Sequence, residues 1–114
     1  MTRMIPSIAA SLLLMVGTSV IPKEHTFTGE IMDTDCSPIG IHAVVGPLKT
    51  KRQCTIDCVR FGAQYVLYDP DIQMAYGLDD QRRPERFAGE AVIVTGTLDK
   101  ISHVIHVLDV RPMD

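Results

Sequence analysis

The chain has 114 residues and a formal net charge of −3, which together allow one small domain with an acidic surface. The acidic balance argues against a polyanionic partner, because phosphate binding needs a net positive surface. Trp is absent and Phe and Tyr are few, which weakens any platform for stacking bases. We therefore expect no nucleic-acid partner.

The N-terminal segment has the pattern of an export signal. Arg3 is its only charged side chain, and a nearly uncharged apolar run follows from residue 5 to residue 20. Gly17 and Ser19 are small residues at the positions that signal peptidase requires to be small. Residues 1–19 are therefore predicted to be a secretory signal peptide.

Export places the remaining domain, residues 20–114, in the periplasm or outside the cell. Removing Arg3 leaves ten basic against fourteen acidic side chains, so the balance becomes −4. The alternative is a retained anchor, because residues 4–21 approach the length of a membrane span. Only in that case would the protein contact a membrane.

The first half of the domain is predicted to contain one strand and one helix. Alternating apolar residues predict a half-buried strand over 26–33, and Gly29 marks the position where it bends. The chain from 37 to 49 is predicted to be irregular because of its Pro and Gly residues. A helix over 51–61 follows, since Thr50 and Gln53 form a capping box at its start.

The second half is predicted to form two hairpins separated by a helical turn. Strands over 65–68 and 73–78 form the first hairpin, and strands over 91–98 and 104–110 form the second. A single helical turn over 85–88 lies between them, because a proline precedes it and a glycine follows it. Five short strands, with a helix inserted between strands 1 and 2 and a helical turn between strands 3 and 4, predict a mainly β, OB-fold-like barrel.

Several motifs resemble a family of small exported bacterial OB-fold-like proteins of unknown function. They are Gly29-Glu30-Ile31-Met32-Asp33-x-x-Cys36, Cys54-x-x-x-Cys58-x-x-x-Gly62, Tyr65-Val66-Leu67-Tyr68-Asp69, Leu78-Asp79-Asp80-Gln81, Phe87-Ala88-Gly89, Val94-Thr95-Gly96-Thr97-Leu98-Asp99 and Ile105-His106-Val107. The resemblance implies the fold and brings no established activity. The segment 37–49 is poor in Met and His, which argues against a role in copper handling.

Three cysteines and one histidine form the candidate site: Cys36, His42, Cys54 and Cys58. On a helix, Cys54 and Cys58 share one face, with Cβ atoms about 5–6 Å apart. That distance is too wide for an unstrained disulfide, so a disulfide is predicted between Cys36 and either Cys54 or Cys58. The first alternative is a zinc ion held by all four residues, since Cys₃His is a known tetrahedral zinc ligand set. The second alternative is that all three cysteines are reduced thiols.

The helical thiols and Phe61 form an apolar stripe that is predicted to face the body of the protein. Other titratable side chains could take part in acid–base chemistry or metal binding but are predicted to be solvated. They are Asp33, Asp35, Asp79, Asp80, His103 and His106. The sequence contains no Ser/His/Asp ordering, phosphate-binding glycine loop or Cys-x-x-Cys motif.

The leading functional prediction is an exported, non-enzymatic binding module, with a disulfide joining its inserted helix to the first strand. Its partner would be a small ligand or another envelope protein. The first alternative is the zinc protein described above. The second alternative is a thiol-redox protein that uses the unpaired cysteine.

Overall fold

The computed structural model describes residues 23–40 and 50–113. The predicted signal peptide and His42 lie outside these residues. No helix in these two stretches is long and apolar enough to span a bilayer. The elements follow in this order: β1 (His25–Asp33), η1 (Ser37–Ile39), α1 (Lys51–Arg60), β2 (Tyr65–Asp69), β3 (Met74–Leu78), η2 (Arg83–Phe87), β4 (Ala91–Asp99) and β5 (Val104–Pro112).

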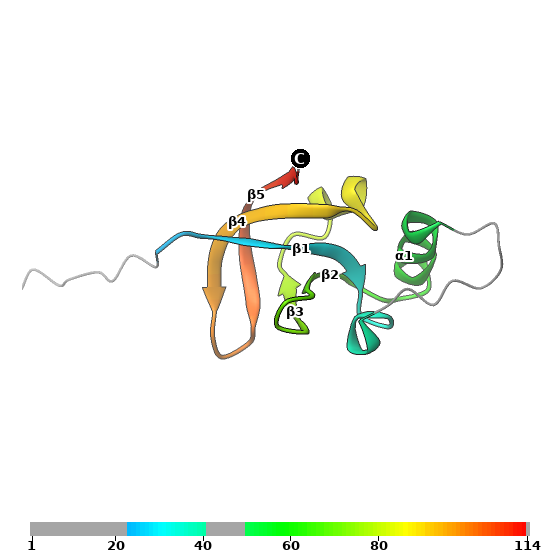
Figure 1. Ribbon diagram of the computed structural model, residues 1–114, viewed down its shortest axis with the longest axis horizontal. Helices are drawn as coiled ribbons and strands as arrows, with labels where there is room; N and C mark the ends of the chain where they lie inside the picture. The colour runs from blue at the N-terminus through cyan, green and yellow to red at the C-terminus, as the bar shows by residue number, and fades with distance from the viewer. Residues whose placement is uncertain (1–22, 41–49, 114) are drawn as a thin grey trace, which may run out of the picture.

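The five strands form one sheet that closes on itself (Figure 1). β1 pairs with both β2 and β4, β2 pairs with β3, and β4 pairs with β5, all antiparallel. A short parallel pairing of β3 with β5 completes the ring in the order β1-β2-β3-β5-β4. The predictions of a mainly β domain with five strands and two hairpins are confirmed.

The inserted helix α1 starts where the capping box predicts. The Thr50 side chain accepts a hydrogen bond from the backbone N–H of Gln53 at 3.1 Å. The Gln53 side chain does not return this bond and instead donates to Asp57 at 2.7 Å. The chain leaves the helix at Gly62, whose φ of 110° favours glycine over other residues.

The two short 3-10 helices match the prediction only in part. η2 begins at Arg83, two residues before the predicted turn over 85–88. η1 lies in the segment predicted to be irregular, where Pro38 opens a single turn and Gly40, with φ of 69°, ends it. A turn of three residues offers too little apolar periodicity to be found from sequence.

The main core fills the inside of the closed sheet. Its fully buried strand residues come from four of the strands: Ile31, Leu67, Val92, Val94 and Ile105. Ala88, just before β4, is fully buried beside them. In β4, buried residues alternate with more exposed ones, as expected for a strand with one buried face. The predicted inward face of the first strand is confirmed by Ile31 and by the buried Gly29.

A second, smaller core lies between α1 and the end of β1. Its buried members are Met32, Cys36, Cys54 and Val66. Figure 1 shows α1 at one end of the sheet, above the turn that follows β1. Because α1 covers this end, β1 is buried on both faces at its last residues, which places three cysteines and one aspartate in the same small volume.

Candidate metal centre

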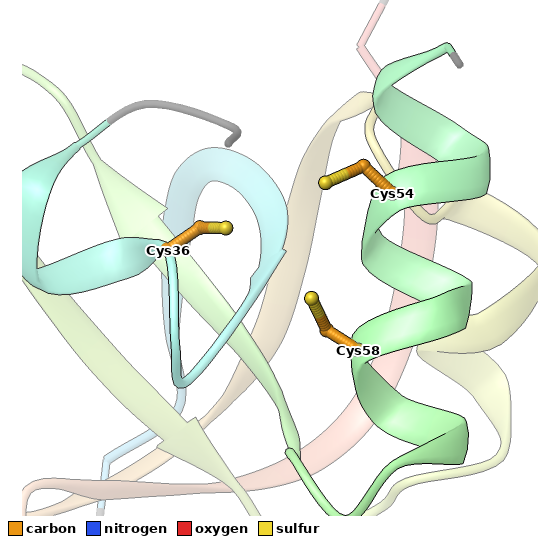
Figure 2. Close-up of side chains that lie close together, drawn as sticks. All are labelled: Cys36, Cys54 and Cys58. Atoms are coloured by element: carbon orange, nitrogen blue, oxygen red, sulfur yellow. The ribbon is translucent and has the colours of Figure 1, made fainter. Parts of the chain in front are cut away.

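The helix α1 directs two thiols toward the sheet. Cys54 and Cys58 are four residues apart and point from the same side of α1 toward Cys36 (Figure 2). Cys54 is 4% exposed, and Cys58 is partly exposed at the edge of the cluster. The prediction that the helical thiols face the body of the protein is therefore confirmed.

The prediction that Phe61 belongs to the inward-facing apolar stripe of the helix is wrong, because Phe61 is 92% exposed. Phe61 is the residue that ends α1, and its backbone N–H donates to the carbonyls of Asp57 and Cys58. It lies almost one turn beyond Cys58, where the chain turns away at Gly62. The apolar face of the helix thus ends before Phe61 can reach the sheet.

The turn after β1 holds the third thiol. One carboxylate oxygen of Asp33, Oδ1, accepts the backbone N–H of Asp35 at 2.9 Å and that of Cys36 at 3.0 Å. This side-chain bond to the following backbone is the usual way an aspartate stabilises a tight turn. It places Cys36, which is 2% exposed, opposite the helical thiols.

The three sulfur atoms form a compact cluster. The Sγ atoms of Cys36, Cys54 and Cys58 all lie within 4.8 Å of one another. Across the described residues, which include every cysteine of the chain, no disulfide joins any pair, so the predicted staple of Cys36 to a helical cysteine is not present in the structure. The two sulfur atoms of a disulfide are about 2.05 Å apart. The three thiols instead form a group in which no two sulfur atoms are bonded.

The electrostatic surroundings of Cys58 disfavour a reactive thiol. Burial, together with the negative charges that Asp33, Cys36, Cys54 and Asp35 carry when ionised, raises the pKa of this thiol from 9.0 to about 12. Thiol chemistry requires the thiolate, which a raised pKa makes scarce at neutral pH. The same negative groups would attract a cation, and a bound cation would in turn favour the thiolate form that metal ligation requires.

The prediction that Asp33 is solvated is wrong, because its exposed fraction is 0%. Asp33 is the last residue of β1, and α1 and the following turn cover it. Its second carboxylate oxygen, Oδ2, is buried and has no hydrogen-bond partner among the described residues. A carboxylate oxygen of Asp33, one of Asp35 and the Sγ atom of Cys58 lie within 4.8 Å of one another. The sequence signal for this position was the spacing Asp33-x-x-Cys36, because an aspartate at the start of a tight turn often accepts the backbone N–H groups that follow it.

The structure brings together three of the four residues predicted to bind metal, and the fourth, His42, is outside the described residues. The two other histidines singled out by the sequence lie elsewhere. His106 pairs through Nδ1 with the carboxylate of Asp79. His103 adopts a φ of 60° in the β4–β5 turn and stacks on Tyr76 with a centroid distance of 4.7 Å.

Asp79 gives a pH-dependent prediction. The hydrogen bond from the backbone N–H of Val107 lowers the pKa of Asp79, and the pairing with His106 lowers it further. A lowered pKa means that the stabilisation is complete above the ordinary carboxyl pKa and is lost as the pH falls through the folded-state value. Asp79→Asn should therefore flatten the fall in melting temperature between pH 5 and pH 2.

Thermal unfolding followed by circular dichroism across this pH range measures the effect. Asp109→Asn, at an exposed position of β5, is the control and should retain the acid slope of the unmodified protein. An Asp79→Asn variant with the same slope as the unmodified protein would show that the contact contributes nothing to acid stability.

No family model matches this chain, and neither a curated protein nor a solved structure matches it. The resemblance to exported OB-fold-like proteins therefore stays a prediction. Function rests on the geometry of the described residues, and the thiol cluster is the part of that geometry with the most specific chemistry.

Proposed function

We propose that this chain is a metal-binding module that holds one zinc ion through Cys36, Cys54 and Cys58. The observation that carries this proposal is the convergence of three Sγ atoms within 4.8 Å from two separate elements. Three sulfurs bound to one zinc ion at about 2.3 Å lie roughly 3.8 Å apart in tetrahedral geometry. Only a small contraction of the cluster is needed to reach that spacing.

The ligand type favours zinc. Thiolates bind soft and borderline cations, of which zinc and copper(I) are the common examples. Copper-handling proteins draw on thioethers and imidazoles as well, and Met and His are scarce in the segment between β1 and α1. Cys58 lies at the partly exposed edge of the cluster, which gives an ion a route from solvent.

The metal would act as a link between the helix and the sheet. In the part of the chain that the structure describes, the second core that joins them has four buried residues, and a domain of this size gains much from a crosslink. Zinc would thus take the structural part that the sequence assigned to a disulfide. Zinc and disulfide compete for the same thiols, so the two states exclude each other.

We infer that the supporting scaffold is an OB-fold-like barrel. The closed strand order β1-β2-β3-β5-β4, the helix between β1 and β2 and the short helix between β3 and β4 support this assignment. Export to the periplasm or cell exterior stays part of the proposal, and N-terminal sequencing of protein from the native host should begin near Val20. An intact Met1 in a cytoplasmic fraction would contradict export.

Metal content and thiol count test the proposal together. Protein purified from the periplasm without chelator should carry one equivalent of zinc and show three titratable thiols after chelation and denaturation. At free zinc one thousand times Kd, binding contributes about 4 kcal/mol. Chelation should therefore lower Tm by about 15 °C or more in a domain of this size.

Two variants sharpen this experiment. Cys54→Ser should lose the zinc and melt near the temperature of the chelated protein, because it removes a buried ligand of the cluster. His106→Ala is the matched control, since it removes a good zinc ligand far along the chain from the cluster and should keep the full zinc content. One titratable thiol and no zinc in the unmodified protein would contradict the proposal and favour the disulfide.

A further inference from the structure

The thiol cluster supplies three ligands, whereas structural zinc sites are almost always four-coordinate. Two described carboxylates come close to the cluster, Asp33 and Asp35, and both approach the Sγ atom of Cys58 within 4.8 Å. Cys58 therefore belongs to the thiol group and to the carboxylate group at once. Either carboxylate could therefore supply a fourth ligand without a contribution from a distant segment of the chain.

Asp33 has the properties of an incomplete metal site. Its side chain is fully buried, and one of its two oxygens, Oδ1, has backbone partners in the following turn. The other, Oδ2, has no partner within residues 23–40 and 50–113. Burying a carboxylate oxygen without a partner is costly, and an isolated unsatisfied group in a native structure calls for an explanation. A cation beside the thiols supplies one.

The turn after β1 gives the two carboxylate oxygens of Asp33 different environments. Oδ1 accepts the backbone N–H groups of Asp35 and Cys36, so the carboxylate is held in place by the same turn that positions Cys36. Metal-bound carboxylates commonly have their other oxygen hydrogen-bonded in this way, which fixes their orientation. Asp35 differs from Asp33 in that it lies at an exposed position, where its carboxylate is open to solvent.

We propose that Oδ2 of Asp33 is the fourth ligand of the ion bound by Cys36, Cys54 and Cys58. This inference rests on the proposed function and makes the site a closed Cys₃Asp centre. A carboxylate ligand favours zinc over copper(I), because copper(I) prefers soft sulfur ligands to carboxylate oxygens. A zinc ion bound by Asp33 would also offset the cost of burying this side chain, because its positive charge neutralises the carboxylate.

Cobalt(II) binding to the full domain under anaerobic, reducing conditions tests the assignment. Asp33→Asn keeps an oxygen for the two backbone N–H groups of the turn but replaces Oδ2 with a neutral amide. We expect it to remain folded by circular dichroism, to bind cobalt at least about 10–100-fold more weakly, and to show shifted d–d absorption bands. The unmodified protein should show the intense visible bands of a tetrahedral site with thiolate charge transfer.

Two control variants separate the possible oxygen and nitrogen ligands. Asp35→Asn should bind cobalt as the unmodified protein does, because its side chain is exposed. His42→Ala should do so too. Loss of affinity in His42→Ala with none in Asp33→Asn would overturn the assignment of Asp33 and support the Cys₃His set.

X-ray absorption of the zinc-loaded unmodified protein gives a readout that does not depend on how a variant folds. We expect three sulfur neighbours and one oxygen neighbour, without the outer-shell scattering of an imidazole ring. A fourth sulfur or an imidazole pattern would overturn the role of Asp33 while leaving the thiol site intact. Failure of the unmodified protein to bind zinc or cobalt would instead overturn the proposed function itself.

Discussion

Val94→Asp is expected to leave the domain unfolded at 25 °C. Val94 is 0% exposed and lies in the middle of β4, where it pairs with Phe27 of β1 on one side and Val110 of β5 on the other. A carboxylate at this position would have no partner in the main core, and burying it would cost several kcal/mol. A small domain has a total stability of only about 5–15 kcal/mol, so one such change can exhaust it.

Urea titration followed by circular dichroism measures this effect. Leu108→Asp is the matched control, because Leu108 lies on the neighbouring strand β5 and is 41% exposed. The control should unfold within about 0.5 kcal/mol of the unmodified protein, as surface substitutions usually do. A cooperative Val94→Asp transition at the same urea concentration as the control would contradict the burial of this strand.

Gly29→Ala should also cause a large loss of stability. Gly29 lies where β1 changes partners, since residues 25–30 pair with β4 and residues 30–33 pair with β2. A Cβ atom at this position would lie 2.3 Å from the backbone oxygen of Tyr68. That contact is far shorter than van der Waals distance, and the strand that carries the oxygen is already held in the sheet. Overpacking of this kind costs about 1–3 kcal/mol, and more where backbone must move.

Thermal unfolding should show a fall in Tm of about 10 °C or more, taking about 4–8 °C per kcal/mol for a domain of this size. Gly77→Ala is the matched control on β3. The nearest atom to its added Cβ would be a side-chain methyl of Val104 at 3.0 Å, which can move by a rotation of the side chain. An equal fall in Tm in both variants would contradict the prediction, because it would show that the close approach of the Tyr68 backbone to Gly29 does not add to the loss of stability.

The proposed metal centre includes the end of the same strand, β1. Met32 and Asp33 at that end are fully buried. The centre would in turn hold α1 against this end of the strand. Zinc affinity and folding stability should therefore change together in variants of the second core, whereas variants of the main core should reduce stability without changing the ligand set.

Local sequence determined the elements and part of the site. Strand alternation predicted all five strands, because one face of each strand packs into the interior of the closed sheet. The capping box placed the start of α1 at Lys51, since Thr50 satisfies a backbone N–H within the same turn. The four-residue spacing of Cys54 and Cys58 placed both thiols on one face of the helix, because that relation is set by helical geometry alone.

The tertiary structure decided what lies opposite those thiols. Asp33 is polar and is the last residue of an alternating strand, so its sequence surroundings predict solvent exposure. It is buried because α1, a separate element about 20 residues later, covers the end of β1. Phe61 has the reverse outcome, since the helix ends before the residue reaches the sheet. The sequence by itself determines periodicity and spacing within an element, whereas the distance between elements depends on how they pack, and the thiol–carboxylate cluster is a product of that packing.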